Sequence, residues 1–492
     1  MVLVNQFIGT SIMLFKIHAE KSADDTKIFY YDNMKNVLTD ESGFVFEYPN
    51  ITPRSGMIPS KAFSKDDPLK KSKKITTLKI QLGLSCNYSC SYCSQKFVKR
   101  PAETSKKDID AFLAKLEVLD ISEDTGLKIE FWGGEPLVYW KTMKPLAEAL
   151  EEKYEHWVNK PSFSVITNGS LLTREMCSWL YYMNFSVGIS HDGPGQHVRG
   201  PDPFDDEEKK NIILEFYKIM HQTGRISFNS MMNRSNQSRK EIHDWFVKLT
   251  SDPTVQVGEG SFVDAYDEDG ANSSLPTLND HFEYRRGSFN DMRGYGKSMN
   301  FPNLYDKIDG FTKGVLTHFN GEYVGQKCGM DNESTLAVDL SGNVVTCQNV
   351  SVKETSKNGQ PHLGGNLSDY DNVALKSVTH WKNRNDCASC PVLHLCRGSC
   401  MYLDGKYWDI TCDSAFSDNI PLFALAFANI TGGYIPTIID NDHLPLDRQD
   451  IWGTFYQHAN ADEPKFQNTK IIVKKVGLVN DVEVYGEAEA EV

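Results

Sequence analysis

Ten of the 11 cysteines in this chain fall into two groups, and this distribution constrains the fold more than any other feature. The first group is Cys86, Cys90 and Cys93, with the spacing C-x3-C-x2-C, and the second comprises seven cysteines between positions 328 and 412. The total is odd, and no basic residue precedes Lys16, so the N-terminus does not resemble a secretory signal peptide. We therefore expect metal ligation in a reducing compartment, the cytoplasm, rather than disulfides.

Length and charge narrow the class of protein further. A chain of 492 residues exceeds one ordinary domain of roughly 100–200 residues, so two or three domains are expected. The formal net charge of −14 argues against a nucleic-acid backbone or an anionic membrane as the main partner. No run of about 20 uncharged apolar residues occurs, so the sequence predicts no membrane-spanning helix.

Short apolar strands alternate with amphipathic helices from Thr77 to about position 264, which indicates βα units and a parallel sheet. The expected strands are Leu78–Leu84, Lys128–Trp132, Phe163–Thr167, Ser186–Ser190, Ile226–Met232 and Val255–Val263, and the expected helices include Asp108–Leu119, Thr142–Val158 and Arg174–Met183. Six such units predict an α/β fold built on a partial (β/α)6 TIM-like barrel, with its chemistry at the carboxyl ends of the strands.

The rest of the chain flanks this barrel. Residues 1–75 are predicted to form a small β-rich module and linker, because Lys27–Tyr31 and Gly43–Tyr48 are rich in β-branched and aromatic residues. The module could recognise a peptide or merely cover the barrel, and the lysine-rich stretch 61–74 is interpreted as a solvated connector. We expect the barrel over 76–265, a polar connection over 266–325, a cysteine-rich iron–sulfur domain over 326–415, and a C-terminal extension over 416–492 that ends in a frayed acidic tail.

The first cysteine group lies directly after the first expected strand of the barrel. Three thiolates can hold three irons of a 4Fe–4S cluster and leave the fourth open to a substrate or cofactor, whereas a zinc knuckle would lack its fourth ligand. The strand Lys128–Trp132 is followed by Gly133-Gly134-Glu135-Pro136. The two glycines let backbone approach a ligand closely, and the carboxylate of Glu135 can accept hydrogen bonds from an ammonium group.

Together, these motifs resemble the radical S-adenosylmethionine (radical SAM) superfamily over residues 77 to about 264. The resemblance implies that Cys86, Cys90 and Cys93 bind a catalytic 4Fe–4S cluster whose open iron is chelated by S-adenosylmethionine. It also implies cofactor-binding positions from several strand ends: Tyr92, Gly133, Gly134, Glu135, Asn168, Ser190 and Arg199, with Asn229 and Met231 as weaker candidates. Turn capping by Asn168 and Asp192 and core packing by Met231 are the alternatives for these positions.

The second cysteine group is similar at every spacing to the SPASM extension of radical SAM enzymes, although two C-x2-C-like pairs alone could form a zinc ribbon. The resemblance implies two auxiliary 4Fe–4S clusters, and so three in all. The outer cluster would be held by Cys387, Cys390, Cys396 and Cys412, and the inner one by Cys328, Cys347 and Cys400. The inner cluster is one ligand short, and Glu322 is a candidate for it. Cys177 is left over, as a buried inert thiol or a hydrogen-atom donor.

Enzymes of this kind mostly modify peptides and proteins, so the resemblance implies a maturase that cross-links a ribosomally made, leader-bearing peptide through a C–S or C–C bond. A flavodoxin or ferredoxin would donate electrons. Sulfatase-maturating members carry, directly after the cysteine of G-x4-C, an aspartate that acts as the base. Here that position is Gln348, which cannot take a proton. A dehydrogenase of a protein side chain or small alcohol is the alternative enzyme, and a non-catalytic iron–sulfur or zinc scaffold is the alternative of another class.

Overall fold

The computed structural model describes residues 13–49, 57–95, 104–356, 359–376 and 378–454, together with the backbone of 471–479 and 482–490. Its elements before the second cysteine group are β1 (Leu14–Ser22), β2 (Asp25–Asp32), β3 (Val37–Asp40), β4 (Leu69–Lys70), β5 (Thr77–Gln81), α1 (Ile109–Leu116), β6 (Lys128–Trp132), α2 (Trp140–Lys153), β7 (Ser162–Thr167), α3 (Arg174–Tyr182), β8 (Ser186–Ser190), α4 (Glu207–His221), β9 (Ile226–Met232), α5 (Arg239–Thr250), β10 (Val257–Phe262), α6 (Glu268–Asn272), α7 (Leu278–Tyr295) and α8 (Pro302–Leu316). The remainder are β11 (Thr335–Asp339), β12 (Asn343–Val345), β13 (Leu363–Asn366), β14 (Ala374–Leu375), α9 (Leu393–Cys396), α10 (Gly405–Thr431), β15 (Ile435–Asp440), α11 (Leu446–Gln449), β16 (Ile471–Val479) and β17 (Val482–Ala490).

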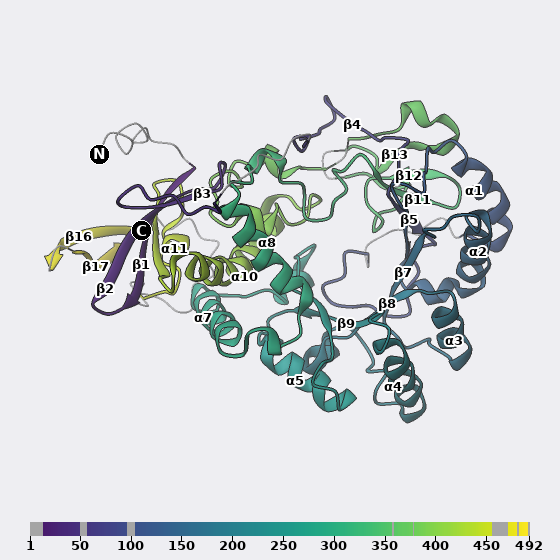
Figure 1. The fold of residues 1–492 in the computed structure, drawn as a ribbon, viewed down its shortest axis with the longest axis horizontal. Helices are drawn as coiled ribbons and strands as arrows, with labels where there is room; N and C mark the ends of the chain where they lie inside the picture. Colours follow the sequence, from purple (N-terminus) through teal and green to yellow (C-terminus); the bar gives the residue numbers. More distant parts are fainter. Residues whose placement is uncertain are drawn as a thin grey trace.

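Six parallel strands form the predicted partial barrel. They lie side by side in the order β5 to β10, each hydrogen-bonded to the next strand of the chain, and the sheet stays open at β10. The α/β fold class is therefore confirmed, and β6, β8 and β9 have the expected bounds. Helices α1 to α4 run along the outer side of the strands (Figure 1).

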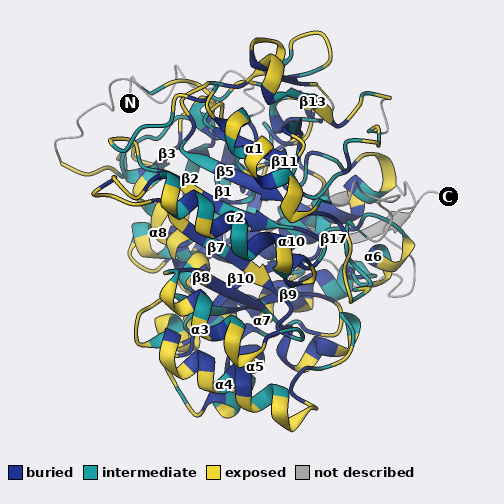
Figure 2. Ribbon diagram, turned by 90° about the vertical axis from the view of Figure 1, so that its right-hand side faces the viewer, coloured by how far each residue is buried: buried dark blue, intermediate teal, exposed yellow. Residues whose placement is uncertain are grey.

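Local sequence explains why the helices of the barrel begin where they do. The side chains of Thr173, Asp206 and Ser238 each accept a hydrogen bond from a backbone N–H in the first turn of α3, α4 and α5. These caps satisfy donors that a helix cannot satisfy itself. Each helix then buries one stripe against the sheet, which is dark blue in Figure 2, and exposes its other face.

The second cysteine region continues the barrel sheet. Strand β11 pairs in parallel with β5, and β12 and β13 extend the sheet antiparallel, which gives nine strands in all. Val338 lies opposite Ile80 in this register, and both side chains are fully buried. Cys328 before β11 and Cys347 after β12 are therefore placed by the same sheet as the first cysteine group.

A second sheet joins the two ends of the chain. Its strand order is β15-β1-β2-β3, and Ile17 on β1 lies opposite Ile439 on β15. Of the two predicted strands in this region, Lys27–Tyr31 lies within β2, but Gly43–Tyr48 is irregular apart from one bridge at Val45. The segment contacts β3 only briefly, through that bridge and through the Phe46 N–H, which donates to the carbonyl of Leu38 at 3.0 Å.

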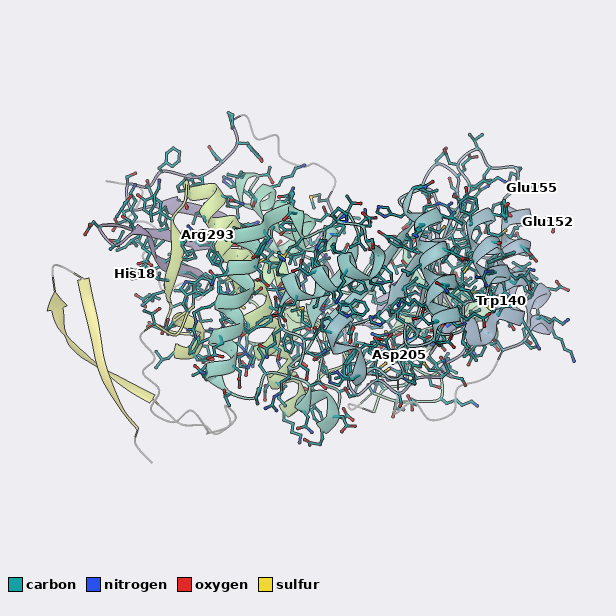
Figure 3. All side chains as sticks on the ribbon, turned by 90° about the horizontal axis from the view of Figure 1, so that it is seen from below. His18, Trp140, Glu152, Glu155, Asp205 and Arg293 are labelled. Carbon is teal, nitrogen blue, oxygen red and sulfur yellow. The ribbon has the colours of Figure 1, made fainter. Side chains whose placement is uncertain are left out.

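The two sheets lie toward opposite ends of the molecule. In Figure 3, His18 on β1 and Arg293 at the end of α7 lie on one side, and Trp140 on α2 lies on the other. Helix α10 packs against α7 and α8 and against the second sheet. One continuous apolar core nevertheless runs through the barrel, α10 and the second sheet.

Two regions differ from the sequence-based expectations. The lysine-rich stretch is not wholly a solvated connector, because Lys71 is buried and its ammonium donates to the carbonyls of Met330 (2.7 Å) and Asn332 (2.8 Å). Desolvation lowers the pKa of Lys71 to about 7. The C-terminal tail is paired rather than frayed, since β16 and β17 form an antiparallel hairpin. Within the described residues, every helix is too short or too polar to span a bilayer.

Candidate active site and cysteine clusters

The first cysteine group lies in a loop at the carboxyl end of the parallel sheet, directly after β5. Cys86 is exposed, and Cys90 and Cys93 are half-buried. Burial raises the pKa of the Cys90 thiol to about 11, while Arg199 opposes that rise and Cys93 and Cys86 add to it. The loop therefore brings the three thiols within electrostatic reach of one another and of one cation.

Gly133 and Gly134 hold this loop from the neighbouring strand β6. The Gly134 N–H donates to the carbonyl of Gly83 at 3.1 Å, and the Glu135 N–H donates to that of Ser85 at 3.0 Å. A Cβ on Gly134 would lie 2.4 Å from the Ser85 carbonyl oxygen, and one on Gly133 would lie 2.8 Å from that of Gly83. The close approach for which these glycines are needed is thus an approach to the cysteine loop itself.

Glu135 is buried, with 2% of its surface exposed. Its carboxylate accepts from the hydroxyl of Thr167 (2.7 Å) and from the N–H groups of Leu137 (3.0 Å) and Asn168 (2.8 Å). Burial raises the pKa of Glu135, and these hydrogen bonds oppose the rise. The side chain therefore joins the ends of β6 and β7.

Asn168 caps a turn, as the alternative interpretation expects, and also reaches the cysteine loop. Its Oδ1 accepts from the N–H (3.0 Å) and hydroxyl (2.6 Å) of Ser170. Its Nδ2 donates to Oδ1 of Asn87 at 2.9 Å, within the C-x3-C segment. One side chain thus fixes both the turn after β7 and the loop that carries Cys86.

Tyr92, Asp192 and Arg199 form a buried network beside the cysteines. The Tyr92 hydroxyl donates to Oδ2 of Asp192 at 2.5 Å, and Arg199 donates to the Tyr92 hydroxyl at 2.8 Å. Asp192 also accepts from the Met231 N–H at 3.0 Å, so it bridges β8 and β9 rather than capping its own turn. The buried Nε of Arg199 has no hydrogen-bond partner among the described residues.

Ser190 lies at the carboxyl end of β8, opposite Asn229 on β9. The amide of Asn229 fits between two glycines, because a Cβ on Gly188 would lie 2.4 Å from its Nδ2 and one on Gly258 would lie 2.2 Å from its Oδ1. Asn229 lines a cavity of about 280 Å³ inside the barrel, together with Glu130 and Trp132. An interior space lined by both polar and apolar side chains thus lies within the barrel.

The four cysteines predicted for the outer set come together around α9 and the start of α10. Burial raises the pKa of Cys387, and Cys396, Cys412 and Cys390 raise it further. Burial likewise raises the pKa of Cys390 to about 12, against the effect of Arg448. Each of the four thiols is therefore within electrostatic reach of others in the set.

The three cysteines predicted for the inner set also meet. Burial raises the pKa of Cys347 to about 12, with a further contribution from Cys328, and Cys347 acts on Cys400 in turn. The Tyr266 hydroxyl donates to Sγ of Cys400 at 3.2 Å. Lys79, on the first barrel strand, faces both Cys328 and Cys347, so the inner set adjoins the barrel interior.

Within the described residues, no three His, Cys, Asp or Glu side chains are close enough to share a single metal ion. A cubane cluster binds each thiolate at a different iron, so its ligands stand farther apart than those of one ion. The three sets of thiols have the composition that such clusters need, and the thiols within each set lie within electrostatic reach of one another.

Three further residues that the sequence singled out are Glu322, Gln348 and Cys177. The backbone carbonyl of Glu322 accepts hydrogen bonds from Ser60 and Lys382, and its carboxylate makes no described contact with the inner cysteines. Gln348 directly follows Cys347 and its carbonyl accepts from Gln81 at 2.7 Å. Cys177 is buried in α3, where burial raises its pKa to about 12, as expected for an inert thiol.

Sequence reasoning missed the roles of Asp192, Tyr266 and Lys79. Asp192 had a usable signal, because it follows β8 directly, where side chains reach the carboxyl end of the sheet. Tyr266 and Lys79 had none, since their partners are cysteines of the second group, far away in the sequence.

Comparison with known proteins agrees with this geometry. The sequence profile of the radical SAM superfamily matches residues 80–246. The chain is 24% identical over 369 residues to the radical SAM cyclopropyl synthase TigE of Paramaledivibacter caminithermalis, covering 69% of this chain and 70% of that one. It is 29% identical over 168 residues to the serine-type anaerobic sulfatase-maturating enzyme of Bacteroides thetaiotaomicron, which covers 33% of this chain and 36% of the relative.

A solved structure has a similar fold. Native anSMEcpe with bound AdoMet and Cp18Cys peptide superposes with a TM-score of 0.51 at 18% identity, over 72% of this chain and 99% of the other.

Proposed function

The chain carries a radical SAM domain, whose fold implies S-adenosylmethionine and a 4Fe–4S cluster as cofactors, and on that premise we propose that it modifies a ribosomally made peptide. The modification proposed is a C–S or C–C cross-link. The observation that carries the proposal is the gathering of all ten grouped cysteines into one set of three at the carboxyl end of the barrel, a second set of three beside it and a set of four. When bound, the reduced cluster and S-adenosylmethionine supply a 5′-deoxyadenosyl radical that takes a hydrogen atom from a substrate carbon.

The chain's own residues hold and shield these cofactors. Cys86, Cys90 and Cys93 would bind the catalytic cluster, and the backbone N–H groups of Gly134 and Glu135 fix their loop. The guanidinium of Arg199, within electrostatic reach of Cys90, suits an anionic group such as the cofactor's carboxylate. Tyr92 and Asp192 hold that guanidinium in place.

In this proposal Glu135 and Asn168 hold the strand ends and the cysteine loop in place, and Ser190 contacts the cofactor. Both carboxylate oxygens of Glu135 already accept hydrogen bonds, so its part is to fix the ends of β6 and β7. The carbonyls of Gly133 and Gly134 would accept from the methionyl ammonium, since that of Glu135 already accepts from the Val138 N–H at 3.1 Å. Ser190 would add a hydroxyl at the end of β8.

The auxiliary clusters are proposed as two further 4Fe–4S groups of a SPASM domain. Cys387, Cys390, Cys396 and Cys412 would close the outer one, whereas Cys328, Cys347 and Cys400 leave the inner one an open iron. Since the carboxylate of Glu322 makes no described contact with these thiols, we propose that the open position is available to substrate. Lys79 and Tyr266 line that side of the inner set.

A peptide substrate and a new bond are supported by the relatives. The superposed anSMEcpe structure holds a peptide, and TigE is named a cyclopropyl synthase, whose ring requires carbon–carbon bond formation. The second candidate is oxidation of a protein side chain, because sulfatase-maturating enzymes are also relatives. Gln348 counts against it, since an amide cannot serve as the base.

Anaerobic reconstitution tests the proposal. The wild-type chain should hold about 12 irons, three clusters of four, and should form 5′-deoxyadenosine when dithionite supplies electrons. The C86A/C90A/C93A variant should form none, and cleavage that persists in it would refute the assignment. Co-expression with a short peptide encoded beside the gene should give a product lighter by about two hydrogens, whereas an unchanged mass would refute cross-linking.

A further inference from the structure

The turn after β2 reaches the outer cysteine set from more than three hundred residues away in the sequence. Asn33, in this turn, has none of its surface exposed. Its Nδ2 donates to the carbonyl oxygens of Ala388 (2.8 Å) and Cys390 (2.9 Å). The backbone carbonyl of Asn33 accepts from Nε2 of His394 at 2.6 Å, which places a third hydrogen bond between the same two segments.

These hydrogen bonds fall on the loop that carries two of the four outer thiols. The segment from Cys387 to Cys390 is irregular, and a buried carbonyl without a partner is costly. Within it, the Cys390 carbonyl also accepts from the Leu393 N–H at 3.2 Å. The Asn33 amide supplies a bond to the Ala388 carbonyl and a second bond to that of Cys390. Next to it, the ring of Tyr31 is 1% exposed and lies within electrostatic reach of Cys390, which closes this side of the set to water.

The sheet that carries Asn33 is poorly suited to adding a peptide strand. On one edge, Thr39 of β3 bridges to Val45, and residues 44–46 cover that strand. On the other edge, Ile438 of β15 bridges to Asp450, and the Ile451 N–H donates to the carbonyl of Thr437 at 3.1 Å. Peptide recognition by strand addition needs an open edge, and both edges are occupied at these positions.

We propose that the hairpin of β2 and β3 is a housing for the outer cluster and that Asn33, in its turn, is the residue through which it positions the Cys387–Cys390 loop. This inference rests on the proposed function, because it requires an iron–sulfur cluster at the outer set. It replaces a peptide-recognition role for the N-terminal strands with a role in cluster retention.

The test compares N33D with N36D in the reconstituted full chain. N33D exchanges the amide donor for a carboxylate that faces two carbonyl oxygens. Asn36 lies in the same turn, is equally buried, and uses only its Oδ1, which accepts from Tyr31 at 2.8 Å, so N36D keeps its hydrogen bond. The readouts are iron per chain, the rate of iron loss to an added chelator, and the electron paramagnetic resonance signal of the reduced outer cluster. That signal is identified by its absence from C387A/C412A.

In N33D, about four irons should be lost at least about tenfold faster than in wild type, and the outer-cluster signal should broaden or shift. N36D should match wild type in its rate of iron loss and in its outer-cluster signal. Equal rates and signals in N33D and wild type, or equal changes in N33D and N36D, would overturn the proposal.

If N33D does not fold by circular dichroism, N33A, which removes the donor without adding charge, is measured against the same control. A wild-type chain that holds only about four irons would instead refute the auxiliary clusters of the proposed function. If wild type holds about 12 irons but N33D loses iron at the wild-type rate and keeps the wild-type signal, only the role of Asn33 is refuted and the proposed function stands.

Discussion

Arg448 donates a guanidinium N–H to Sγ of Cys412 across 3.4 Å, and the same nitrogen donates to Oδ1 of Asp413 at 2.8 Å. Both Arg448 and Asp413 are largely buried, so this contact is little screened by water. A hydrogen bond and a positive charge on a cluster sulfur stabilise the reduced, more negative state and raise the reduction potential. R448Q should therefore lower the midpoint potential of the outer cluster by on the order of 50 mV.

The measurement for R448Q is a redox titration followed by electron paramagnetic resonance. R225Q is the matched control, because it removes the same charge from the opposite, amino end of the barrel, where Arg225 lies over the ring of Tyr181. A potential that is unchanged in R448Q, or that falls equally in R225Q, would contradict an effect through Cys412.

Y92F should weaken binding of S-adenosylmethionine about tenfold, while the iron content stays that of wild type. The Tyr92 hydroxyl bonds to both Asp192 and Arg199, so its loss leaves the guanidinium held to Asp192 by their direct contact of 3.5 Å alone, without removing any cysteine. Equilibrium dialysis of the reconstituted chain with S-adenosylmethionine measures the affinity. Y88F is the control, because the Tyr88 hydroxyl lies on the same loop but donates to the carbonyl of Pro201 at 2.6 Å. Equal affinities in the two variants would show that the network does not position Arg199.

G134A should remove the catalytic cluster. The added methyl would stand 2.4 Å from the Ser85 carbonyl oxygen and 2.5 Å from that of Leu84, and backbone cannot yield as a flexible side chain can. About four irons per chain should be lost, along with 5′-deoxyadenosine formation. In G287A the new Cβ on helix α7 has nothing within 4 Å, so this control should keep its iron and be about 0.5–1 kcal/mol more stable. Full iron content in G134A would mean that the turn can move aside.

The barrel could be predicted because its strands are short apolar runs between amphipathic helices, a pattern that is local in the sequence. Helix α7 could not, because several residues that it buries are polar, including His281 and Arg285, both of which bond to the hydroxyl of Ser417 on α10. Because the segment is polar, the sequence predicted a connection there rather than a helix. The helix is stabilised by hydrogen bonds to a distant part of the chain, which a local hydrophobic pattern does not record.

The candidate site shows the same division between local and distant information. The cysteines and the Gly133–Glu135 turn can be recognised from spacing alone. The positions of Arg448, Asn33 and Tyr266 beside particular thiols depend on pairing between segments far apart in the chain, such as β1 with β15. No periodicity within either segment records such a pairing.

A buried ion pair joins the barrel to the helix that carries Cys412, and its removal should destabilise the whole fold. Arg239 at the start of α5 donates to Oδ1 of Asp418 on α10 at 2.6 Å and to the Gly260 carbonyl at 2.7 Å, and the Tyr284 hydroxyl also donates to Asp418. Both charged side chains are nearly inaccessible. R239M leaves the carboxylate buried without its cation, which should cost about 3–5 kcal/mol.

The double variant R239M/D418L separates loss of the pair from loss of one partner. With both charges replaced by apolar side chains, no uncompensated charge stays buried, so at least about half of the lost stability should return. Urea unfolding followed by circular dichroism gives the free energies for wild type, both single variants and the double variant. The second substitution can compensate for the first only if Arg239 and Asp418 are directly coupled. Additive losses of stability in the double variant would therefore mean that Arg239 stabilises the fold through Gly260 and Ser288 rather than through Asp418.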